Sequence, residues 1–425
     1  MTYGVTTSTS TLAKLYKKVQ GNVLTGMQNK CPEWRLLNGL KEFTLDASAR
    51  EVTTPIRITR QPTGAFIPEG GYEANPKTEA PQELTFPFVM YNDRFSFSRL
   101  SEHLDRTQRK AQLVRQAREQ TARMVEGLCR RVSISFYGAS TGVIAETTTN
   151  ATQASGTYAL ADAYGYANFD DTTYFTRLIV VGDYVALIRS GNLVTNAIGI
   201  VTAVSTSGIA VTWAGSVDSD ADDQVVLANS AGHLVTTGTI AHTDYNKAPN
   251  GLVDFLTATD VHSLSGSTYP LWNPAGLETS ATRMTGTRIK KAEHSIMNAG
   301  GGTANLFIHS QGINRDIFSN TSSAVQYNDP LGMEIMGDFK TKGISQFTSQ
   351  YVPAGFAMVA DKSALNRWSI TTMPSEDAQD LEGQPETTVD KLQDISAKVQ
   401  SFDLVYNFIN NNRGNLYGFA NVVES

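Results

Sequence analysis

A run of three glycines is the first feature of this chain that could do chemistry. Gly300, Gly301 and Gly302 form the kind of segment that can cradle a phosphate group. The run follows a predicted helix and precedes a predicted strand, which is the reverse of a phosphate-binding loop, and no Lys-Ser/Thr pair comes after it. We therefore interpret it as the end of a helix, where glycine is favoured.

An acidic stretch is the second candidate, because it resembles the start of a calcium-binding loop. It contains Asp218, Asp220, Asp222 and Asp223. Calcium loops of this type need glycine at the sixth position and glutamate at the twelfth, where this chain has Asp223 and Asn229. We predict a solvated turn here, with no metal site and no cofactor.

The other reactive side chains form no recognisable catalytic set. The six histidines lack the paired spacing of metal ligands, and the chain has no GxSxG or GxGxxG motif in a suitable context. Cys31 and Cys129 are far apart in the sequence, and we expect both to be free thiols. The sequence therefore predicts a protein that is not an enzyme, although catalytic residues can also meet only in space.

Composition sets further limits on function. The 425 residues, 40% hydrophobic and 18% charged, are enough for two or three globular domains. A formal net charge of −6 argues against a dedicated nucleic-acid binder, because phosphate contacts need a concentrated basic surface. No apolar run approaches the ~20 residues that cross a bilayer, so we expect no membrane contact. The polar N-terminal segment has no signal-peptide core.

A long extended segment at about 51–89 is the element that must position any functional surface. Short apolar runs at 52–58 and 84–88 flank a stretch rich in Pro and Gly, which is typical of a two-stranded arm. An isolated two-stranded ribbon is marginal in water, so we expect something outside its own domain to hold it. A disordered surface loop is the alternative. Several side chains are too apolar for a solvated linker: Phe66, Ile67, Tyr72, Phe86 and Phe88.

The arm leads into a long helix predicted over about 101–130, where apolar residues recur at three- and four-residue steps. At ~1.5 Å per residue it would be about 45 Å long, which suits a beam between domains. We interpret its basic polar faces mainly as a solvated surface with ion pairs, and weak contact with nucleic acid is the alternative. In that alternative, the basic residues on the side of the helix that faces nucleic acid are Arg106, Arg109, Lys110, Arg115, Arg118 and Arg123.

The rest of the chain predicts two further units. Alternation of apolar and polar residues at 132–136 indicates a strand. The region after it is rich in Thr, Ser, Ala and Gly and predicts a small antiparallel, barrel-like unit inserted in the next domain. Alternating helical and strand patterns after it predict a mixed domain, and an acidic connector at 375–386 leads to a closing strand. The other elements expected are helices near 11–19, 33–43, 288–298 and 313–318, and strands near 306–308, 347–352, 356–359 and 402–408.

Local motifs in the second half of the chain carry a family resemblance. The stretch GLVDFL at 251–256 is followed by YPLWN at 269–273. Later, NLFIHS at 305–310 is followed by YVP at 351–353 and then by AD at 360–361. Together with the order of arm, long helix, β-rich insertion and closing strand, these motifs resemble the major capsid protein of tailed bacteriophages, the Hong Kong 97 fold.

The resemblance implies an α+β fold with an N-terminal arm, an extended loop, a peripheral domain with a spine helix, an axial domain and a β-rich insertion. It also implies domain boundaries on this chain. These are 1–45 for the N-terminal arm, 46–92 for the extended loop, 93–131 for the peripheral domain with the spine helix, 132–150 and 246–385 for the axial domain, 151–245 for the β-barrel-like insertion, and 386–425 for the closing strands of the peripheral domain.

The resemblance implies a major capsid (coat) protein that self-assembles into the icosahedral head shell around double-stranded DNA. Such a protein is part of the virion and is assembled in the host cell cytoplasm. Its partners would be itself, as pentamers and hexamers, a portal protein, packaged DNA bound nonspecifically, and a possible decoration protein. A separate scaffolding protein is expected, because no long extension precedes the loop. The loop would lie on a neighbouring subunit through Arg57, Arg60, Phe66, Ile67, Glu69, Tyr72, Glu73 and Lys77.

Two alternatives and one additional candidate property stay open. The first is the shell protein of an encapsulin-type nanocompartment, which encloses cargo enzymes and not a genome. The second is a carbohydrate-active or adhesive β-rich protein, suggested by the insertion, although this leaves the arm and the long helix unexplained. Some capsid proteins also join a loop lysine covalently to an asparagine of a neighbour. The candidates here are Lys77 with Asn410, Asn411, Asn412 or Asn415.

Overall fold

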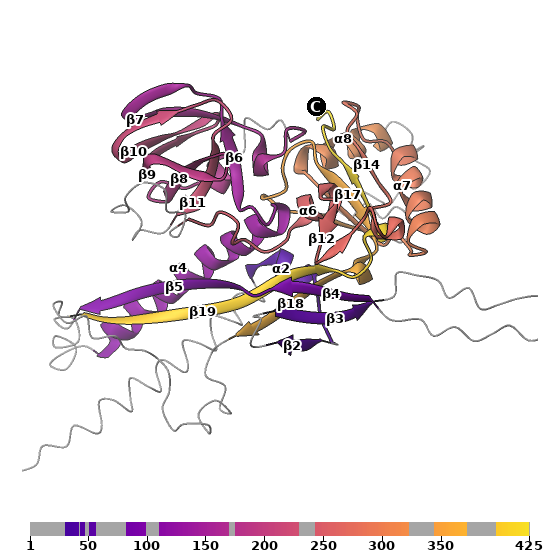
Figure 1. Cartoon of the computed structure of the whole chain (residues 1–425), viewed down its shortest axis with the longest axis horizontal. Helices are drawn as coiled ribbons and strands as arrows, with labels where there is room; N and C mark the ends of the chain where they lie inside the picture. The colour runs from indigo at the N-terminus through magenta and orange to yellow at the C-terminus, as the bar shows by residue number, and fades with distance from the viewer. Residues whose placement is uncertain are drawn as a thin grey trace, which may run out of the picture.

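The structure is a computed structural model. It describes residues 30–41, 43–46, 51–56, 82–98, 110–169, 175–228, 243–322, 344–371 and 397–424. The molecule has two layers (Figure 1). Long strands form the lower layer, and above them lie a β-barrel on one side and a helix-covered sheet on the other (Figure 1). The α+β class expected from the sequence is confirmed. Among the helices of the described segments, none has the length and hydrophobicity of a membrane-spanning helix.

The lower layer is built on a four-stranded sheet in the order β1-β18-β19-β5. Strand β19 pairs antiparallel with β5 along its N-terminal part and with β18 along its C-terminal part. The closing strand expected near 402–408 is confirmed as part of β19, which is longer than predicted. The strands are β1 (Asn38–Gly39), β5 (Val89–Ser98), β18 (Leu365–Thr371) and β19 (Ala397–Asn410).

Helix α4, Lys110–Tyr137, lies above this sheet and has 28 described residues, about 42 Å at ~1.5 Å per residue. The start expected near residue 101 lies outside the described residues. The strand expected at 132–136 is wrong, because α4 continues through it. Val132, Ser133, Ile134, Phe136 and Tyr137 are all buried. A helix end that is enclosed on nearly all sides has no polar stripe, so its apolar alternation was mistaken for a strand.

The arm is a three-stranded sheet at its base. β3 (Glu51–Ile56) pairs antiparallel with β4 (Gln82–Pro87), as predicted, and β2 (Thr44–Asp46) adds an outer strand that the sequence did not indicate. Pro55 is tolerated in β3 because β2 pairs only as far as Thr53, so the proline has no ladder partner on that side. The helix expected over 33–43 ends at Leu36 as α2 (Pro32–Leu36), because Asn38-Gly39 breaks it.

The inserted unit is a closed barrel in the order β10-β7-β6-β11-β8-β9. It begins with β6, directly after α4, and so starts earlier than the expected boundary at 151. All six pairs of neighbouring strands in the barrel are antiparallel. Its strands are β6 (Val143–Thr147), β7 (Ala151–Ala161), β8 (Tyr184–Arg189), β9 (Asn192–Ser205), β10 (Gly208–Ser219) and β11 (Gln224–Ala228), and the short helix α5 (Phe175–Leu178) precedes β8.

The other upper unit is a five-stranded mixed sheet in the order β14-β20-β17-β15-β16. The expected helices near 288–298 and 313–318 are present as α7 and α8, whereas β20 was not predicted. The elements are α6 (Leu252–Thr257), β12 (Asp260–Val261), β13 (Leu264–Ser265), β14 (Gly276–Glu278), α7 (Gly286–Ala299), β15 (Leu306–His309), α8 (Gln311–Ser322), β16 (Ser345–Thr348), β17 (Ala357–Ala360) and β20 (Leu416–Phe419).

One continuous apolar cluster joins these units. It includes Leu128 of α4, Val225 of the barrel, Phe255 of α6, Met358 of β17 and Phe408 of β19. Since the cluster crosses from the lower sheet into both upper units, burial of apolar surface holds the three parts together.

The glycine run ends α7, as predicted. Gly300 is the C-terminal cap residue, and Gly301 has a φ of +68°, a left-handed conformation that glycine adopts without strain. A second reason for glycine was not visible in the sequence. A Cβ atom added to Gly300 would lie 2.6 Å from the backbone carbonyl carbon of Gly414, so the two backbones are too close for a side chain at this position.

Candidate assembly interface

The base of the arm is fixed to the body by aromatic packing. Phe86 of β4 is buried against Trp368 of β18, with ring centroids 6.2 Å apart in an edge-to-face arrangement. Phe88 stacks on the same indole at 5.3 Å with an interplanar angle of 6°. Val52 and Leu84 are also fully buried in this cluster. The root of the ribbon therefore belongs to the core of its own subunit.

The β12–β13 hairpin forms a second contact with the arm. His262 and Ser263 occupy its two-residue turn, with φ of +53° and +63°, as two-residue hairpin turns of this hand require. The backbone N–H of Thr85 in β4 donates to the His262 carbonyl at 3.3 Å and to Ser263 Oγ at 3.2 Å. The His262 ring lies between Phe86 of the arm and Phe255 of α6, at centroid distances of 5.6 and 5.5 Å. The histidine thus joins the arm to the upper unit.

The environment of His262 favours its neutral form. Burial and, to a smaller extent, the positive charge of Arg413 lower the pKa of His262 from 6.5 to about 3. Both ring nitrogens are buried without a hydrogen-bond partner among the described residues. Protonation would therefore place an uncompensated charge between two aromatic rings.

We predict that acid weakens the protein partly through this residue. Between the unfolded-state pKa of 6.5 and the folded-state pKa of about 3, the unfolded chain binds a proton that the folded chain does not. Stability is therefore complete above pH 6.5 and is lost as the pH falls. From pH 6.5 to about pH 4 this loss should amount to about 3 kcal/mol.

The substitution His262→Asn should remove this part of the pH dependence, because asparagine does not titrate and tolerates a left-handed backbone. The measurement is the free energy of unfolding of both proteins across this pH range. Parallel pH profiles for parent and variant would contradict the role of His262.

Three exposed apolar side chains lie at the arm base or near it. Phe43 and Leu45, beside and within β2, are 41% and 48% exposed, and Met90 at the start of β5 is 65% exposed. Large apolar side chains left in solvent near a fixed aromatic cluster are typical of surfaces that another molecule covers. The arm base therefore presents a suitable surface to a partner.

The segment before the arm is held by a buried carboxylate. Glu33 of α2 is 0% exposed, and its carboxylate accepts hydrogen bonds from Ser133 Oγ of α4 at 2.7 Å and from Ser349 Oγ. Trp34 lies under the guanidinium of Arg367 at 4.4 Å from the ring centroid, and its carbonyl accepts from the same arginine. Helix α2 is thus bound to both layers.

A buried arginine closes the end of α6. Arg413 is 1% exposed and donates from Nε to the Phe255 carbonyl at 2.9 Å and from Nη2 to the Ala258 carbonyl at 2.6 Å. These acceptors lie at the C-terminal end of α6, where carbonyl groups lack partners within the helix. Burial lowers the pKa of Arg413 to about 10, so the side chain stays charged at neutral pH.

The basic face of α4 is partly used inside the subunit. Arg130 pairs with Asp183 and also donates to the Leu178 carbonyl at 2.9 Å, and Arg131 pairs with Asp244. Both aspartates belong to the inserted unit or its return segment, so these arginines hold the barrel on the helix. Arg123 is exposed on α4. Lys110, Arg115 and Arg118 lie within α4, and Arg106 and Arg109 lie outside the described residues.

The predicted loop contacts are on the part of the arm beyond β3 and β4. All of them lie outside the described residues and stay predictions: Arg57, Arg60, Phe66, Ile67, Glu69, Tyr72, Glu73 and Lys77. The structure places the root of this loop, at the Ile56–Gln82 pair, at the edge of the lower layer (Figure 1).

The acidic stretch is an arginine-bound turn. Arg189 of β8 donates from Nε and Nη2 to the two carboxylate oxygens of Asp223, at 2.7 and 2.8 Å, and Asp223 is 1% exposed. The guanidinium occupies the side of the turn where a calcium loop would direct its ligands. In the described segments no group of acidic, histidine or cysteine side chains is arranged to hold a metal ion.

Comparison with known proteins gives similarity in fold only. No family model matches the chain. No curated protein matches it in sequence. Among solved structures, the chain is similar to a chain of the cyanophage A-1(L) capsid asymmetric unit, with 12% identity and a TM-score of 0.49, over 92% of this chain and 93% of that one.

Two further structures are similar at lower scores. For the Gordonia phage Cozz, identity is 11% and the TM-score is 0.41, over 93% of this chain and 87% of that chain. For the satellite phage P4 procapsid, which includes a size determination protein, identity is 8% and the TM-score is 0.39, over 99% and 98% of the two chains. Each of these three alignments covers at least nine-tenths of this chain.

Proposed function

We propose that this chain is the major capsid protein of a tailed phage and assembles into the shell that encloses double-stranded DNA. One observation carries the proposal: the root of the arm is buried in its own subunit, and its strands β3 and β4 end together at the edge of the lower layer (Figure 1). A ribbon of two strands does not stay ordered alone in water, so its outer part needs a partner surface. A second copy of the chain supplies that surface in a shell.

The lower layer supports the same conclusion. Strands β5 and β19 and helix α4 together form a long, thin support and not a compact body. A shell subunit needs such a support, because it must span the wall and meet several neighbours at once. The buried links at Glu33, His262 and Arg413 keep the arm root, the helix and the upper units in a fixed relation.

In this proposal the protein is structural and not an enzyme. Its partners are other copies in pentamers and hexamers, a separate scaffolding protein, a portal protein and packaged DNA held without sequence preference, and a decoration protein is an additional candidate. The predicted loop residues provide the contact with the neighbouring copy, with Phe66, Ile67 and Tyr72 as apolar anchors. The site of action is the virion, after assembly in the host cytoplasm.

The test is the size of the purified material. The chain, produced together with its scaffolding protein, is expected to elute as megadalton particles, and negative-stain microscopy should show closed shells of uniform size. Removal of the loop beyond β3 and β4, by joining Ile56 to Gln82 through a short Gly-Ser turn, should leave the folded subunit intact and abolish the shells. A chain that stays monomeric at high concentration under all these conditions would overturn the proposal.

A further inference from the structure

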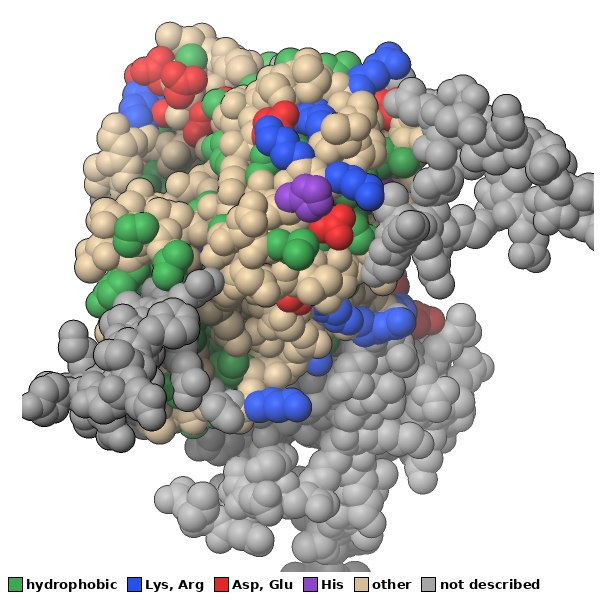
Figure 2. Space-filling model, turned by 90° about the vertical axis from the view of Figure 1, so that its right-hand side faces the viewer, with side chains coloured by type: hydrophobic (Ala, Val, Ile, Leu, Met, Phe, Trp, Pro, Cys, Tyr) green, Lys and Arg blue, Asp and Glu red, His purple; other side chains and the backbone are tan. Residues whose placement is uncertain are grey.

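The outer side of α7 carries a stripe of exposed side chains that no contact among the described residues explains. Lys290, His294 and Met297 recur at four- and three-residue steps, so they lie along one face of the helix, and all three are exposed. Met297 is 56% exposed, which is unusual for a side chain of this size and polarity. The space-filling view shows lysine and arginine side chains around a histidine on this side of the molecule (Figure 2).

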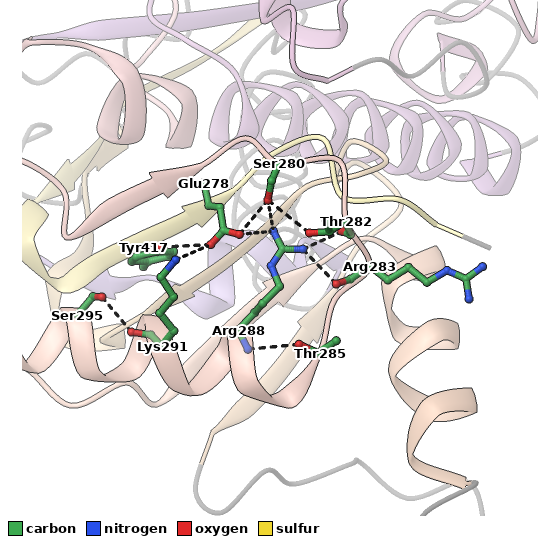
Figure 3. A network of polar contacts seen from close by, with 9 residues as sticks. All are labelled: Glu278, Ser280, Thr282, Arg283, Thr285, Arg288, Lys291, Ser295 and Tyr417. Atoms are coloured by element: carbon green, nitrogen blue, oxygen red, sulfur yellow. Dashed lines mark hydrogen bonds and ion pairs between the residues drawn. The ribbon is translucent and has the colours of Figure 1, made fainter.

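A polar network next to this stripe holds α7 in place. Glu278 of β14 pairs with Arg288 at 3.1 Å and with Lys291 at 3.2 Å, and Ser280 Oγ donates to the same carboxylate at 2.9 Å (Figure 3). Burial alone would raise the pKa of Glu278, but the bonds from Ser280 and Lys291 and the charge of Arg288 lower it. The rotation of α7 is fixed in this way, and the stripe is directed outward.

Arg283 extends the basic surface. It precedes α7, is exposed, and points away from the Glu278 network (Figure 3). We call Arg283, Lys290, Lys291, His294 and Met297 the α7 face. The face combines positive charge with one flexible apolar side chain, a composition that fits a protein partner with carboxylates at its surface.

The barrel carries the complementary charge. Asp218 near the end of β10 and Asp220 and Asp222 on the turn between β10 and β11 are exposed, and Arg189 is the cation that binds this turn. Glu146 of β6 lies close to the same turn. Burial, together with the charges of Asp162 and Asp222, raises its pKa, which is expected where carboxylates are crowded.

The acidic turn lies at the end of the barrel that is remote from α4. The backbone of Asp222 and Asp223 is hydrogen-bonded to Thr147, the last residue of β6, whereas the first residue of β6 follows α4. We call this region, Glu146, Asp162, Asp218, Asp220 and Asp222, the barrel end. The barrel and α7 lie on opposite sides of the upper layer (Figure 1). Two complementary surfaces on different sides of one subunit are what a head-to-tail contact between identical copies requires.

We propose that the α7 face of one subunit binds the barrel end of a second copy of this chain. The inference rests on the proposed shell function and adds a second contact to the arm. A protein partner fits better than nucleic acid, because Glu278 and Glu293 interrupt the positive charge and phosphate binding requires a concentrated basic surface. Closed repetition of such a contact forms a ring.

Charge reversal on each surface tests this contact. One variant carries Arg283→Glu and Lys290→Glu, a second carries Asp218→Lys and Asp220→Lys, and a third carries all four substitutions. Thermal unfolding of the subunits establishes that each variant is folded. A matched control reverses two exposed basic residues outside the α7 face, Arg35→Glu and Lys362→Glu.

Like charges that face each other across an interface repel, so the first two variants should assemble poorly. Their yield of shells should be at least roughly tenfold lower than that of the parent. The variant with all four substitutions should recover to within about twofold of the parent, because the attraction is restored with reversed sign. Sedimentation separates shells from free subunits and measures the yield. The control should assemble like the parent.

Three results would overturn the contact. They are normal yield for both two-residue variants, a four-residue variant no better than the two-residue variants, or unchanged yield with less retained DNA after reversal of the α7 face. The last result would assign the face to phosphate binding. These outcomes differ from failure of the proposed function, in which the parent chain itself forms no particles.

Discussion

Replacement of Arg413 by methionine should lower the free energy of unfolding by about 3–5 kcal/mol. The guanidinium donates to the carbonyls of Phe255 and Ala258, and both acceptors lose their partner in the variant. A buried acceptor without a hydrogen bond costs about 1–3 kcal/mol, and methionine fills the space without replacing a donor. Because these carbonyls end α6, the loss should also loosen the start of the β12–β13 hairpin that carries His262.

The measurement is chemical unfolding of the purified subunit, with hydrogen exchange at α6 as a local readout. Arg413→Lys should recover only part of the loss, because an ammonium group cannot reach two separate carbonyls in the planar geometry of arginine. Arg35→Met is a matched control, since Arg35 is exposed in α2 and its replacement should change stability by less than about 0.5 kcal/mol. Equal stability of Arg413→Met and Arg35→Met would show that the buried guanidinium is not needed.

Substitution of Glu33 by alanine should have the second large effect, a loss of about 3 kcal/mol. The carboxylate is fully buried and joins α2 to Ser133 of α4 and to Ser349. Alanine leaves two buried hydroxyl groups without their acceptor and opens a cavity. Glu33→Gln keeps the volume and one acceptor oxygen, so it should lose about half as much.

Hydrogen exchange distinguishes a local effect from a global one. In Glu33→Ala the amides of α2 should exchange faster than those of α7, because the hydrogen bonds of Glu33 described above go to Ser133 and Ser349 and not to α7. The double substitution Ser133→Ala and Ser349→Ala in the Glu33→Ala background should cost little more, because the three side chains act as one unit. Additive losses would contradict this coupling.

The sequence could predict those elements in which a strong local pattern continued over many residues. The arm, α7, β15 and the closing strand β19 all have such patterns, and all are present. The barrel-like unit was predicted from composition, because frequent Gly and Thr at turns indicate short antiparallel strands. Its first strand was missed, since β6 follows α4 after only a short turn.

Features that depend on contacts between distant residues could not be predicted. Arg413 acts on carbonyls of α6, which are about 155 residues away, and no local pattern distinguishes it from other arginines. His262 and Ser263 form a hairpin turn without the Asn-Gly signal that usually marks one. The extension of α4 to Tyr137 was misread because burial on nearly all sides removes the helical stripe. The proposed contact residues beyond β3 and β4 stay predictions.

The two ion pairs at the end of α4 have a mechanical consequence. Arg130 binds Asp183 and Arg131 binds Asp244, and the two aspartates lie on different parts of the inserted unit. Two contacts at neighbouring positions of the helix oppose rotation of that unit about the helix. Any tilt of the helix would therefore carry the barrel through the same angle. A small rotation of α4 would become a larger displacement at the far end of the barrel, as at the end of a lever.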